Sequence, residues 1–478
     1  MTSSPAPFPA GPPVVVVGAG VGGLTAARAL ADAGRRVVVL EATDRVGGKL
    51  LVHEVAGVRV DVGAEAMLAR RPEGTALAEA LGLAVEHPAT TASRVWTRGA
   101  LRPLPRSVMG APVDASSLRE SGVLSPEGLD RALREPEIPC EPVTDDVSVG
   151  DLVAARFGDE VVDRLVEPLL GGVYAGHARR LSARACVPPL LAALAEGPLL
   201  GRAAPAPTGP VFAGLPGGMG TLTAALAADP RITVRTGTTA RALRRTAEGF
   251  ALTVGPTRDE EEVLASDVVL AVPAAPAARL LADLAPGAAT GLGSVESASM
   301  AVVTLAFAVD ALEGTDAMTG SGFLVPPVDG RHIKASTFSA NKWDWVRRAG
   351  EAGPAPVRLL RTSLGRHGEE RALQADDAAL VRASLTDLAQ ATGLRAAPVA
   401  AHVQRWGGGL PQYAVGHLDL VERVRADVAR ASAAGPGGLA VCGATYDGVG
   451  IPAVIGSAQR AVAGLLAERR GVPGTMAP

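Results

Sequence analysis

Residues 14–49 read VVVVGAGVGGLTAARALADAGRRVVVLEATDRVGGK, and this stretch decides the fold. Four valines run into Gly18-x-Gly20-x-x-Gly23, and small and apolar residues at helical spacing follow the last glycine. A second apolar run, VVVL, ends at Glu41. The order along the chain is therefore strand, turn, helix, strand and acid.

Each part of this order has a role in binding a dinucleotide. Gly18 permits the tight turn, Gly20 lets the backbone approach a pyrophosphate at the helix N-terminus, and Gly23 lets helix and strand pack closely. Glu41 would accept hydrogen bonds from the adenosine ribose hydroxyls. Glycine clusters also close ordinary βα turns, but here the strands, the helix and the acid agree, so we predict a dinucleotide site.

The residues beyond Glu41 favour FAD over NAD. Arg45-Val46-Gly47-Gly48-Lys49 places a second glycine pair just after the ribose acid, and Asp61-Val62-Gly63 follows. NAD-binding chains usually continue directly into the next crossover helix, whereas FAD-binding chains often add an R-x-G-G loop that lies along the cofactor. We therefore predict FAD.

Length and composition set bounds on the rest of the chain. At 478 residues it exceeds the size of a single core, so we expect two domains. A net charge of −3 gives no general attraction for nucleic acid. Among the 46 basic residues only Lys49, Lys334 and Lys342 are lysines. Three separated cysteines and seven scattered histidines indicate neither a disulfide framework nor a metal site.

The first residues and the apolar runs bear on location. Residues 1–13 are typical of a disordered tail rather than a signal peptide, and no apolar run is long enough to span a membrane. We therefore expect a soluble cytoplasmic protein, and peripheral contact with a membrane stays open.

The middle of the chain alternates strand and helix signals. Residues 94–97 predict a short strand, and residues 121–142 are dense in proline and charge, so we expect an irregular surface segment there. Ser148 is a predicted N-cap of one amphipathic helix that Gly171-Gly172 stops. Further helical pieces over residues 181–200 complete a mostly helical insertion.

Later segments predict a second domain and a functional carboxyl end. Strand signals at residues 300–309, 359–364 and 399–406, with one helix over 376–394, indicate a β-rich domain. Near the carboxyl end, Gly450-Ile451-Pro452 opens a helix whose N-terminus could face the N1–C2=O edge of a flavin.

We expect the chain to divide as follows. The tail is 1–13; the FAD-binding domain is 14–92 with 210–285 and 412–478; the substrate domain is 93–120 with 286–411; the helical insertion is 121–209.

Several segments beyond the glycine turn carry a resemblance to a known family. They are VEPLLGGVYAG at 166–176, GLPGGMG at 214–220, RW at 405–406, LPQYAVGH at 410–417 and CGATYDGVGIP at 442–452. On these segments the chain resembles the flavin amine oxidase superfamily, and within it the protoporphyrinogen and coproporphyrinogen oxidases of heme synthesis. The resemblance implies an α/β fold: a Rossmann-like FAD-binding domain of p-hydroxybenzoate-hydroxylase type, a β-rich substrate domain and a helical insertion.

The resemblance also implies site residues. An arginine that meets a substrate propionate corresponds to Arg94. After Gly63 the family often has proline and then a polar or basic residue, whereas this chain has Ala64 and Glu65, an acid that would repel anionic substrate arms unless it points away. The implied FAD contacts are Gly18, Ala19, Gly20, Val21, Gly22, Gly23, Glu41, Ala42, Lys49, Gly63, Ala64, Glu65, Ala66, Ala240, Trp406, Val449, Gly450 and Ile451.

The implied chemistry belongs to the flavin. A porphyrinogen loses six hydrogens on becoming a porphyrin, and three rounds of hydride transfer to non-covalent FAD, each followed by reoxidation with O2, would account for them. No catalytic side chain and no metal are then needed. Porphyrinogen and O2 are the expected partners, and transient contact with neighbouring heme-pathway enzymes stays open.

Alternatives remain within and outside this branch. Amine oxidases of the superfamily commonly carry a lysine on the strand that here covers residues 300–309, which has none. A carotenoid desaturase and a catalytically silent flavin- or porphyrin-binding protein are the other rivals. Between the two porphyrinogens, the absence of a targeting segment, the resemblance to the soluble bacterial branch and the pair Arg70-Arg71 favour coproporphyrinogen III, with four propionates, over protoporphyrinogen IX. Arg71 would meet a second propionate opposite Arg94.

Overall fold

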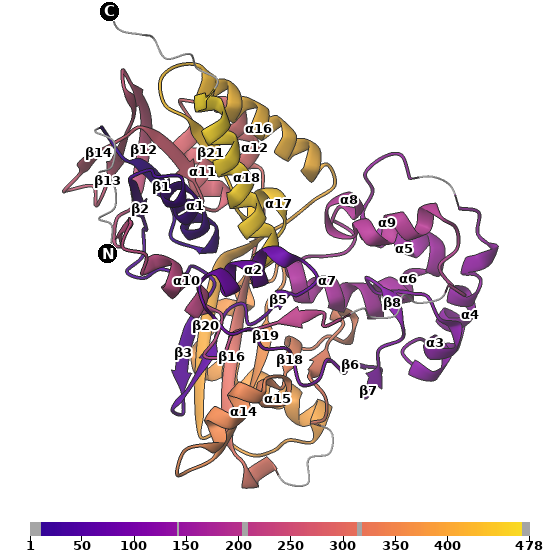
Figure 1. The fold of residues 1–478 in the computed structure, drawn as a ribbon. Coiled ribbons are helices and arrows are strands. Elements are labelled where there is room, and N and C mark those ends of the chain that lie inside the picture. The colour runs from indigo at the N-terminus through magenta and orange to yellow at the C-terminus, as the bar shows by residue number, and fades with distance from the viewer. Residues whose placement is uncertain (1–10, 141–142, 203–208, 313–317, 471–478) are drawn as a thin grey trace, which may run out of the picture.

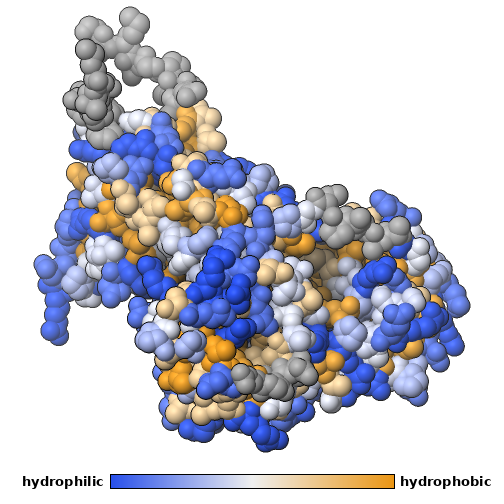
Figure 2. All heavy atoms as spheres, turned by 60° about the horizontal axis from the view of Figure 1, so that its bottom comes forward, coloured by the Kyte–Doolittle hydropathy of each residue, from blue (hydrophilic) through white to orange (hydrophobic). Residues whose placement is uncertain are grey.

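The computed structural model describes residues 11–140, 143–202, 209–312 and 318–470, so most of the predicted tail lies outside the described residues. Figure 1 shows a parallel sheet with its helices at the upper left, a larger sheet below it and a group of helices at the right. Figure 2 shows the surface hollowed where the helices at the right meet the rest of the molecule.

The predicted strand, turn and helix form the centre of the parallel sheet. Its five strands run in the order β11-β2-β1-β15-β21 and are all parallel. They are β1 (Val14–Val17), β2 (Val37–Leu40), β11 (Ile232–Arg235), β15 (Asp267–Leu270) and β21 (Leu439–Val441). Strands from distant parts of the sequence thus complete one dinucleotide-type sheet, as the sequence predicts.

Valines alternate between the two faces of this sheet. Val14 and Val16 pack under α1 (Val21–Asp32), α10 (Gly220–Ala227) and α18 (Ile451–Arg470). Val15 and Val17 pack in a second cluster with α11 (Ala274–Leu281), α12 (Pro286–Gly293) and α16 (His417–Ala433). Because both faces are covered, the strands consist of continuous apolar runs.

Smaller elements surround this sheet. They are the antiparallel set β12 (Ala240–Thr246), β13 (Gly249–Val254) and β14 (Glu261–Ala265), the hairpin β3 (Val52–Val55) and β4 (Val58–Asp61), the pair β5 (Met67–Leu68) and β10 (Phe212–Ala213), and the helices α2 (Pro72–Ala80) and α17 (Ala444–Asp447).

The second sheet has seven strands in the order β20-β16-β19-β18-β17-β6-β7. They are β6 (Ser93–Thr97), β7 (Ala100–Pro103), β16 (Ser297–Ala308), β17 (Gly322–Leu324), β18 (Ile333–Thr337), β19 (Val357–Leu364) and β20 (Ala400–Pro411). The helices beside it are α13 (Ser339–Lys342), α14 (Asp344–Glu351) and α15 (Asp377–Thr392).

The two faces of the second sheet differ. Alternate residues such as Ala301, Phe323 and Leu360 pack with Leu388 of α15. Their strand neighbours therefore point to the opposite face, toward the dinucleotide-binding part. We call that opposite face the cofactor side of the sheet.

The helical part differs from two expectations. It contains β8 (Ser107–Val108), β9 (Ala111–Pro112), α3 (Ala115–Ser121), α4 (Pro126–Leu133), α5 (Val149–Phe157), α6 (Asp159–Val161), α7 (Glu167–Tyr174), α8 (Ala183–Cys186) and α9 (Pro188–Ala195). The irregular segment predicted over 121–142 is wrong in part, because Ser125 caps α4 by accepting from the Gly128 amide, and Pro126 occupies the first turn.

The predicted single helix after Ser148 is also interrupted. Ser148 does cap α5, but Gly158, at φ +91°, ends it. The chain resumes through a π-helical stretch, Val162–Val166, and α7 continues past Gly171-Gly172 to Tyr174. The glycine pair does not stop the helix.

Packing also differs from the expected domain limits. α12 packs with α11 and α16, so it belongs to the core of the parallel sheet rather than to the second sheet. Residues 107–121 pack into the core of the helical part. The limits themselves stay a prediction.

Candidate functional site

The glycine turn has the geometry that the sequence predicts. Gly18 has φ +104°, a conformation that favours glycine, and a Cβ there would lie 2.7 Å from the Ala271 carbonyl oxygen. A Cβ on Gly23 would overlap the Gly18 carbonyl oxygen. Both glycines are therefore required by the protein's own packing.

Gly20 is different, and its surroundings fit a nucleotide phosphate. It precedes α1 with φ −72° and ψ 177°, which any residue can adopt, and a Cβ there would meet no described atom within 4 Å. No side chain of the described residues caps this end of α1. The first amides of a helix need partners and carry partial positive charge, so the open space beside Gly20 suits an anion.

Glu41 is held in place by the turn that it faces. One carboxylate oxygen accepts from the Ala19 amide at 2.8 Å, and the other accepts from the Thr43 amide at 2.9 Å and its hydroxyl at 2.8 Å. Ala42, the next predicted contact, is exposed. The acid is thus fixed at the end of β2, beside the glycine turn, where the first helix starts.

The second glycine pair packs onto the first turn. The Gly47 amide donates to the Ala19 carbonyl at 2.8 Å, and a Cβ on Gly48 would lie 3.3 Å from Gly20 Cα. Arg45 donates to the Gly48 carbonyl at 2.9 Å and so shapes the loop. Two glycine-rich loops, distinct in sequence, therefore line the same space.

Lys49 lies at the end of this loop. Its side chain is exposed to solvent, yet the surrounding protein desolvates the ammonium enough to lower the pKa of Lys49. Both observations agree with a side chain that lines an open space inside the molecule. A Cβ on Gly409 of β20 would lie 3.7 Å from Lys49 Cε, so the loop meets the second sheet here.

Trp406 of β20 joins the same place from the second sheet. Its indole N–H donates to the Val62 carbonyl at 3.0 Å, and a Cβ on Gly63 would lie 3.0 Å from the Trp406 ring. The structure therefore brings Lys49, Gly63 and Trp406 together, as expected for residues that contact one cofactor.

Glu65 is the position at which the chain departs from the family pattern, and the structure shows how its charge is compensated. Its side chain is 9% exposed, with Lys342 Nζ at 2.6 Å from one oxygen and Arg361 Nε at 3.0 Å from the other. Burial alone would raise the pKa of Glu65, but Arg361 and Lys342 outweigh it and hold this pKa below its usual value. The carboxylate therefore forms ion pairs with two cations. Its neighbours Ala64 and Ala66 are partly buried and pack against the apolar clusters.

The predicted carboxyl-end contacts lie beside the first turn. α18 packs against α1, and a Cβ on Gly22 would lie 3.0 Å from Val454. Val449 and Gly450 precede α18, which begins at Ile451, and a Cβ on Gly450 would meet only Pro452, at 4.0 Å, among the described atoms. The first turn of α18 therefore lies beside the start of α1, and a role for its N-terminus at a flavin stays a prediction. Val21, the first residue of α1, packs against the same core.

Ala240 opens β12 on another side of the nucleotide region. The preceding Thr238 amide donates to the Glu41 carbonyl at 2.7 Å, and Ala240 pairs with Val254 just before a register shift. Ala240 therefore lies two residues beyond a direct backbone contact with Glu41.

Arg94 is not brought to this region. Its strand pairs in parallel with β17, with Arg94 beside Phe323, and the guanidinium donates to the Thr319 hydroxyl. Phe323 packs under α15, so Arg94 lies on the face of the second sheet that is opposite the cofactor side. This placement does not support a contact with a substrate next to the flavin.

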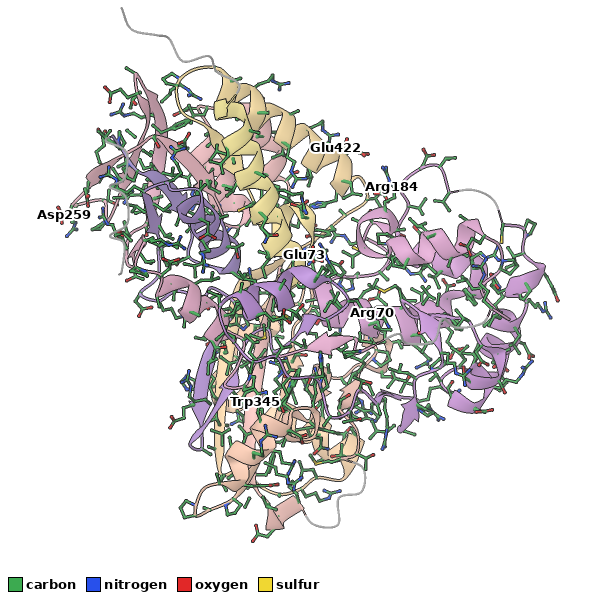
Figure 3. The ribbon with its side chains drawn as sticks, viewed as in Figure 1. Arg70, Glu73, Arg184, Asp259, Trp345 and Glu422 are labelled. Atoms are coloured by element: carbon green, nitrogen blue, oxygen red, sulfur yellow. The ribbon has the colours of Figure 1, made fainter. Side chains whose placement is uncertain are left out.

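Arg71 has a partner of its own. It precedes α2, and its guanidinium lies 2.5 Å from Glu73 Oε1 with a side chain that is 41% exposed. Figure 3 shows Glu73 on the side of α2 toward α18, and Arg70 toward the helical part. A role for Arg71 with a substrate stays a prediction.

The structure adds residues that the sequence did not single out. Asp61 accepts from the Met219 amide at 2.8 Å and ties the GLPGGMG loop to β4, and burial raises the pKa of Asp61 to about 7. Arg361 donates to the Gly63 carbonyl at 2.8 Å. Lys334 lies on the cofactor side of the second sheet. The rarity of lysine was the one sequence signal for Lys334 and Lys342.

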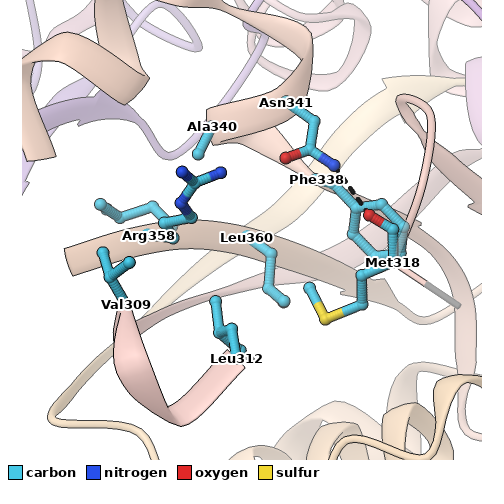
Figure 4. Close-up of a pocket in the computed structure, with 9 residues that line it drawn as sticks. Val309, Leu312, Met318, Phe338, Ala340, Asn341, Arg358 and Leu360 are labelled. Carbon is cyan, nitrogen blue, oxygen red and sulfur yellow. Dashed lines mark hydrogen bonds between the residues drawn. The ribbon is translucent and has the colours of Figure 1, made fainter. Parts of the chain in front are cut away.

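The pocket in Figure 4 lies elsewhere. It has a volume of about 280 Å³ and is lined by Val309, Leu312, Met318, Phe338, Ala340, Asn341, Arg358, Leu359 and Leu360. None of the predicted FAD contacts lines it. A second, smaller space of about 150 Å³ lies beside α16 and α18.

Comparisons with known proteins agree with this geometry. The model of flavin containing amine oxidoreductases matches residues 21–466. A coproporphyrinogen III oxidase of Mycobacterium tuberculosis is 39% identical over 467 residues, which cover 94% of this chain and 96% of that protein. The coproporphyrinogen III oxidase of Bacillus subtilis is 30% identical over 481 residues, covering 95% and 97%.

A solved structure is similar over the same length. The protein, from Exiguobacterium sp. 255-15 and assigned as a protoporphyrinogen oxidase, superimposes with a TM-score of 0.83 at 29% identity and covers 96% of this chain and 99% of its own. No helix within the described residues has the length and apolarity to cross a bilayer. The family match, the fold and the paired glycine loops lead to one conclusion: the chain belongs to the flavin containing amine oxidoreductase family and is an FAD-dependent oxidoreductase.

Proposed function

We propose that this protein oxidises coproporphyrinogen III to coproporphyrin III in heme biosynthesis, with non-covalent FAD as the hydride acceptor and O2 as the final oxidant. The observation that carries the proposal is the similarity, over nearly the whole chain, to two coproporphyrinogen III oxidases from distant bacteria. The cradle formed by the glycine turn, Glu41, Lys49 and Trp406 supplies a place for the cofactor.

FAD, when bound, supplies the hydride-accepting centre, and the residues of the chain bind and orient it. The uncapped amides of α1 suit the pyrophosphate, and Glu41 suits the ribose. Cys442, at the end of β21, is completely buried, and burial raises the pKa of its thiol to about 12. A thiol that stays protonated is a poor nucleophile, which supports non-covalent FAD.

Glu65 and its two partners support an anionic substrate. A free carboxylate near the flavin would repel propionates, but Lys342 and Arg361 compensate this one. The cluster of Glu65, Lys342 and Arg361 therefore carries one net positive charge. Positive charge at this place suits a substrate with carboxylate arms.

Side-by-side steady-state kinetics test the substrate. We expect a higher kcat/KM for coproporphyrinogen III than for protoporphyrinogen IX, and we expect Arg71→Ala to reduce that preference. Equal efficiency, or a preference for protoporphyrinogen IX, would instead assign the protein to the protoporphyrinogen oxidases. The formation of three H2O2 per porphyrin would support O2 as the oxidant. A cytoplasmic location stays a prediction.

A further inference from the structure

Lys334 is a buried lysine, and packing alone does not explain why a lysine occupies this position. Its side chain is 1% exposed, although lysine is among the residues that are rarely buried without a partner. None of the carboxylates in the described residues lies within ion-pair distance of Nζ. Its hydrogen-bond acceptor is the thioether sulfur of Met300, at 3.9 Å, which is a weak acceptor. An apolar side chain of similar length would fill this volume at lower cost.

A β-bulge gives Lys334 its direction. In the pairing of β18 with β19, Ile333 faces Leu364 and Ala335 faces Ser363, so Lys334 is the extra residue between them. Ile333 packs under α15, whereas the Lys334 side chain reaches Met300 on the cofactor side. Bulges of this kind occur next to active sites, where they re-aim a side chain.

Met300 connects Lys334 with the predicted flavin contacts. It pairs with Trp406 across β16 and β20, immediately after a second register shift. Trp406 in turn contacts Gly63 and the backbone of Val62. Lys334 is therefore two side chains away from the place where Lys49, Gly63 and Trp406 meet.

The charges around Lys334 favour loss of its proton. The buried Arg366, two residues after β19, acts on Lys334 as a second positive charge, and Glu369, 3.8 Å from Arg366 and half exposed, opposes it. Glu167 of α7 also interacts with Arg366, and the pKa of Glu167 is raised by burial. Burial first, and Arg366 second, lower the pKa of Lys334 to about 7.

The remaining elements packed on β18 place no charge beside Nζ. Val325, just after β17, donates its amide to the Lys334 carbonyl, and α15 contributes Asp387, which accepts from the His332 and Ile333 amides on the opposite face.

The use of lysine supports a role that needs a removable proton. Three of the 46 basic residues are lysines, and all three lie near predicted FAD contacts. Lys49 is one of those contacts, Lys342 binds Glu65, and Lys334 is linked through Met300 to Trp406. Arginine keeps its proton in proteins, whereas a buried lysine can release it.

We propose that Lys334 is a redox-linked proton site: its amine takes up a proton when the bound flavin is reduced and releases that proton when the flavin is reoxidised. Reduction adds negative charge to the flavin, and a nearby amine then binds a proton more tightly. The linkage concerns FAD alone and does not require a porphyrinogen.

The consequence for turnover rests on the proposed function. In each round the porphyrinogen gives up one hydride, which passes to the flavin, and one proton, which converts the Lys334 amine to an ammonium. Over three rounds the six hydrogens lost are four from the methylene bridges and two from pyrrole N–H groups. O2 then takes two electrons and two protons to form H2O2. One proton is the one that arrived with the hydride, and the other returns from Lys334, so the electrons and atoms balance.

The test is the pH dependence of the flavin midpoint potential in the FAD-loaded protein without substrate. Uptake of two protons per two electrons gives twice the slope of potential against pH that uptake of one proton gives. Between pH 7 and 9 we expect the doubled slope in the wild type and the single slope in Lys334→Met. Lys334→Arg, which keeps its charge, is the matched control and should also show the single slope. Equal slopes in wild type and Lys334→Met would overturn the proposal.

A second measurement covers the case in which the variants load FAD poorly. Lysine labelled with ¹³C at Cε gives signals from only three side chains, and Lys334→Arg identifies one of them. We expect the Lys334 signal to titrate near pH 7 with oxidised flavin and at least two pH units higher with reduced flavin. A titration that is unchanged by reduction would refute the linkage, whether or not the protein oxidises porphyrinogens.

Discussion

Gly20 and Gly23 belong to one motif, yet the structure predicts opposite consequences for replacing them by alanine. At Gly20 the backbone conformation suits alanine, and a Cβ would meet no described atom within 4 Å. Alanine is a poorer N-cap than glycine but lowers the entropy of the unfolded chain, so we expect the free energy of unfolding of the FAD-free protein to change by less than about 1 kcal/mol.

The effect of Gly20→Ala should appear when FAD binds, because the methyl group occupies the space that suits the pyrophosphate. Overpacking by one methyl group costs about 1–3 kcal/mol, which corresponds to a loss of affinity of about five-fold to 150-fold. Gly23→Ala should instead destabilise the FAD-free protein by about 3 kcal/mol or more, since its Cβ would overlap the backbone oxygen of Gly18.

Two measurements separate these effects. Urea unfolding of the FAD-free proteins gives the stability, and quenching of flavin fluorescence during titration gives the affinity. Gly20→Ala should keep the stability and lose the affinity, and Gly23→Ala should lose stability first. If Gly20→Ala binds FAD as tightly as the wild type, the pyrophosphate does not lie at this turn and the cradle described here is wrong.

Three further predictions concern the acids around the cradle. Glu41→Ala should weaken FAD binding by about 1.5–3 kcal/mol, because the ribose hydroxyls lose a charged partner, and fluorescence titration should show a much smaller loss for Glu41→Gln. Glu65→Gln should lower the free energy of unfolding by about 3–5 kcal/mol near neutral pH, because Lys342 and Arg361 lose their buried anion. Since the pKa of Glu65 is lowered in the folded protein, the stabilisation by Glu65 is present above its unfolded pKa and fades as the pH falls. A loss of stability in urea titrations that does not depend on pH would contradict the ion-pair account. For Asp61 the change of stability with pH has the opposite sign. Its pKa is raised to about 7, so the folded protein holds a proton that the unfolded chain releases near pH 4, and the free energy of unfolding should fall as the pH rises from about 4 to 7. Asp61→Asn should flatten this slope in unfolding curves measured across that range.

Local patterns in the sequence predicted the parts of the fold that depend on local chemistry. The glycine turn, the two apolar strands and the N-cap at Ser148 each follow from a few adjacent residues, and the structure confirms them. The helix at Pro126–Leu133 was missed although Ser125 and Pro126 are a good start signal, because the surrounding density of proline and charge was given more weight.

Other features depend on partners that are distant in the sequence. The strand that carries Arg94 was predicted correctly, but strand alternation alone does not say which face a residue takes, and the face is decided by the pairing with β17. Gly171-Gly172 was expected to end a helix, whereas the helix continues and α7 passes close to Leu324 and Arg366, each 3.9 Å from a glycine Cβ position. The direction of Lys334 depends on a bulge between two strands, which no local pattern reveals.

Anaerobic mixing of the FAD-loaded protein with coproporphyrinogen III tests the central claim most directly. The account predicts that the oxidised flavin band bleaches while the substrate is oxidised, and that admission of O2 restores the band and completes the formation of coproporphyrin III. A flavin band that stays unchanged in the presence of excess coproporphyrinogen III would contradict the account.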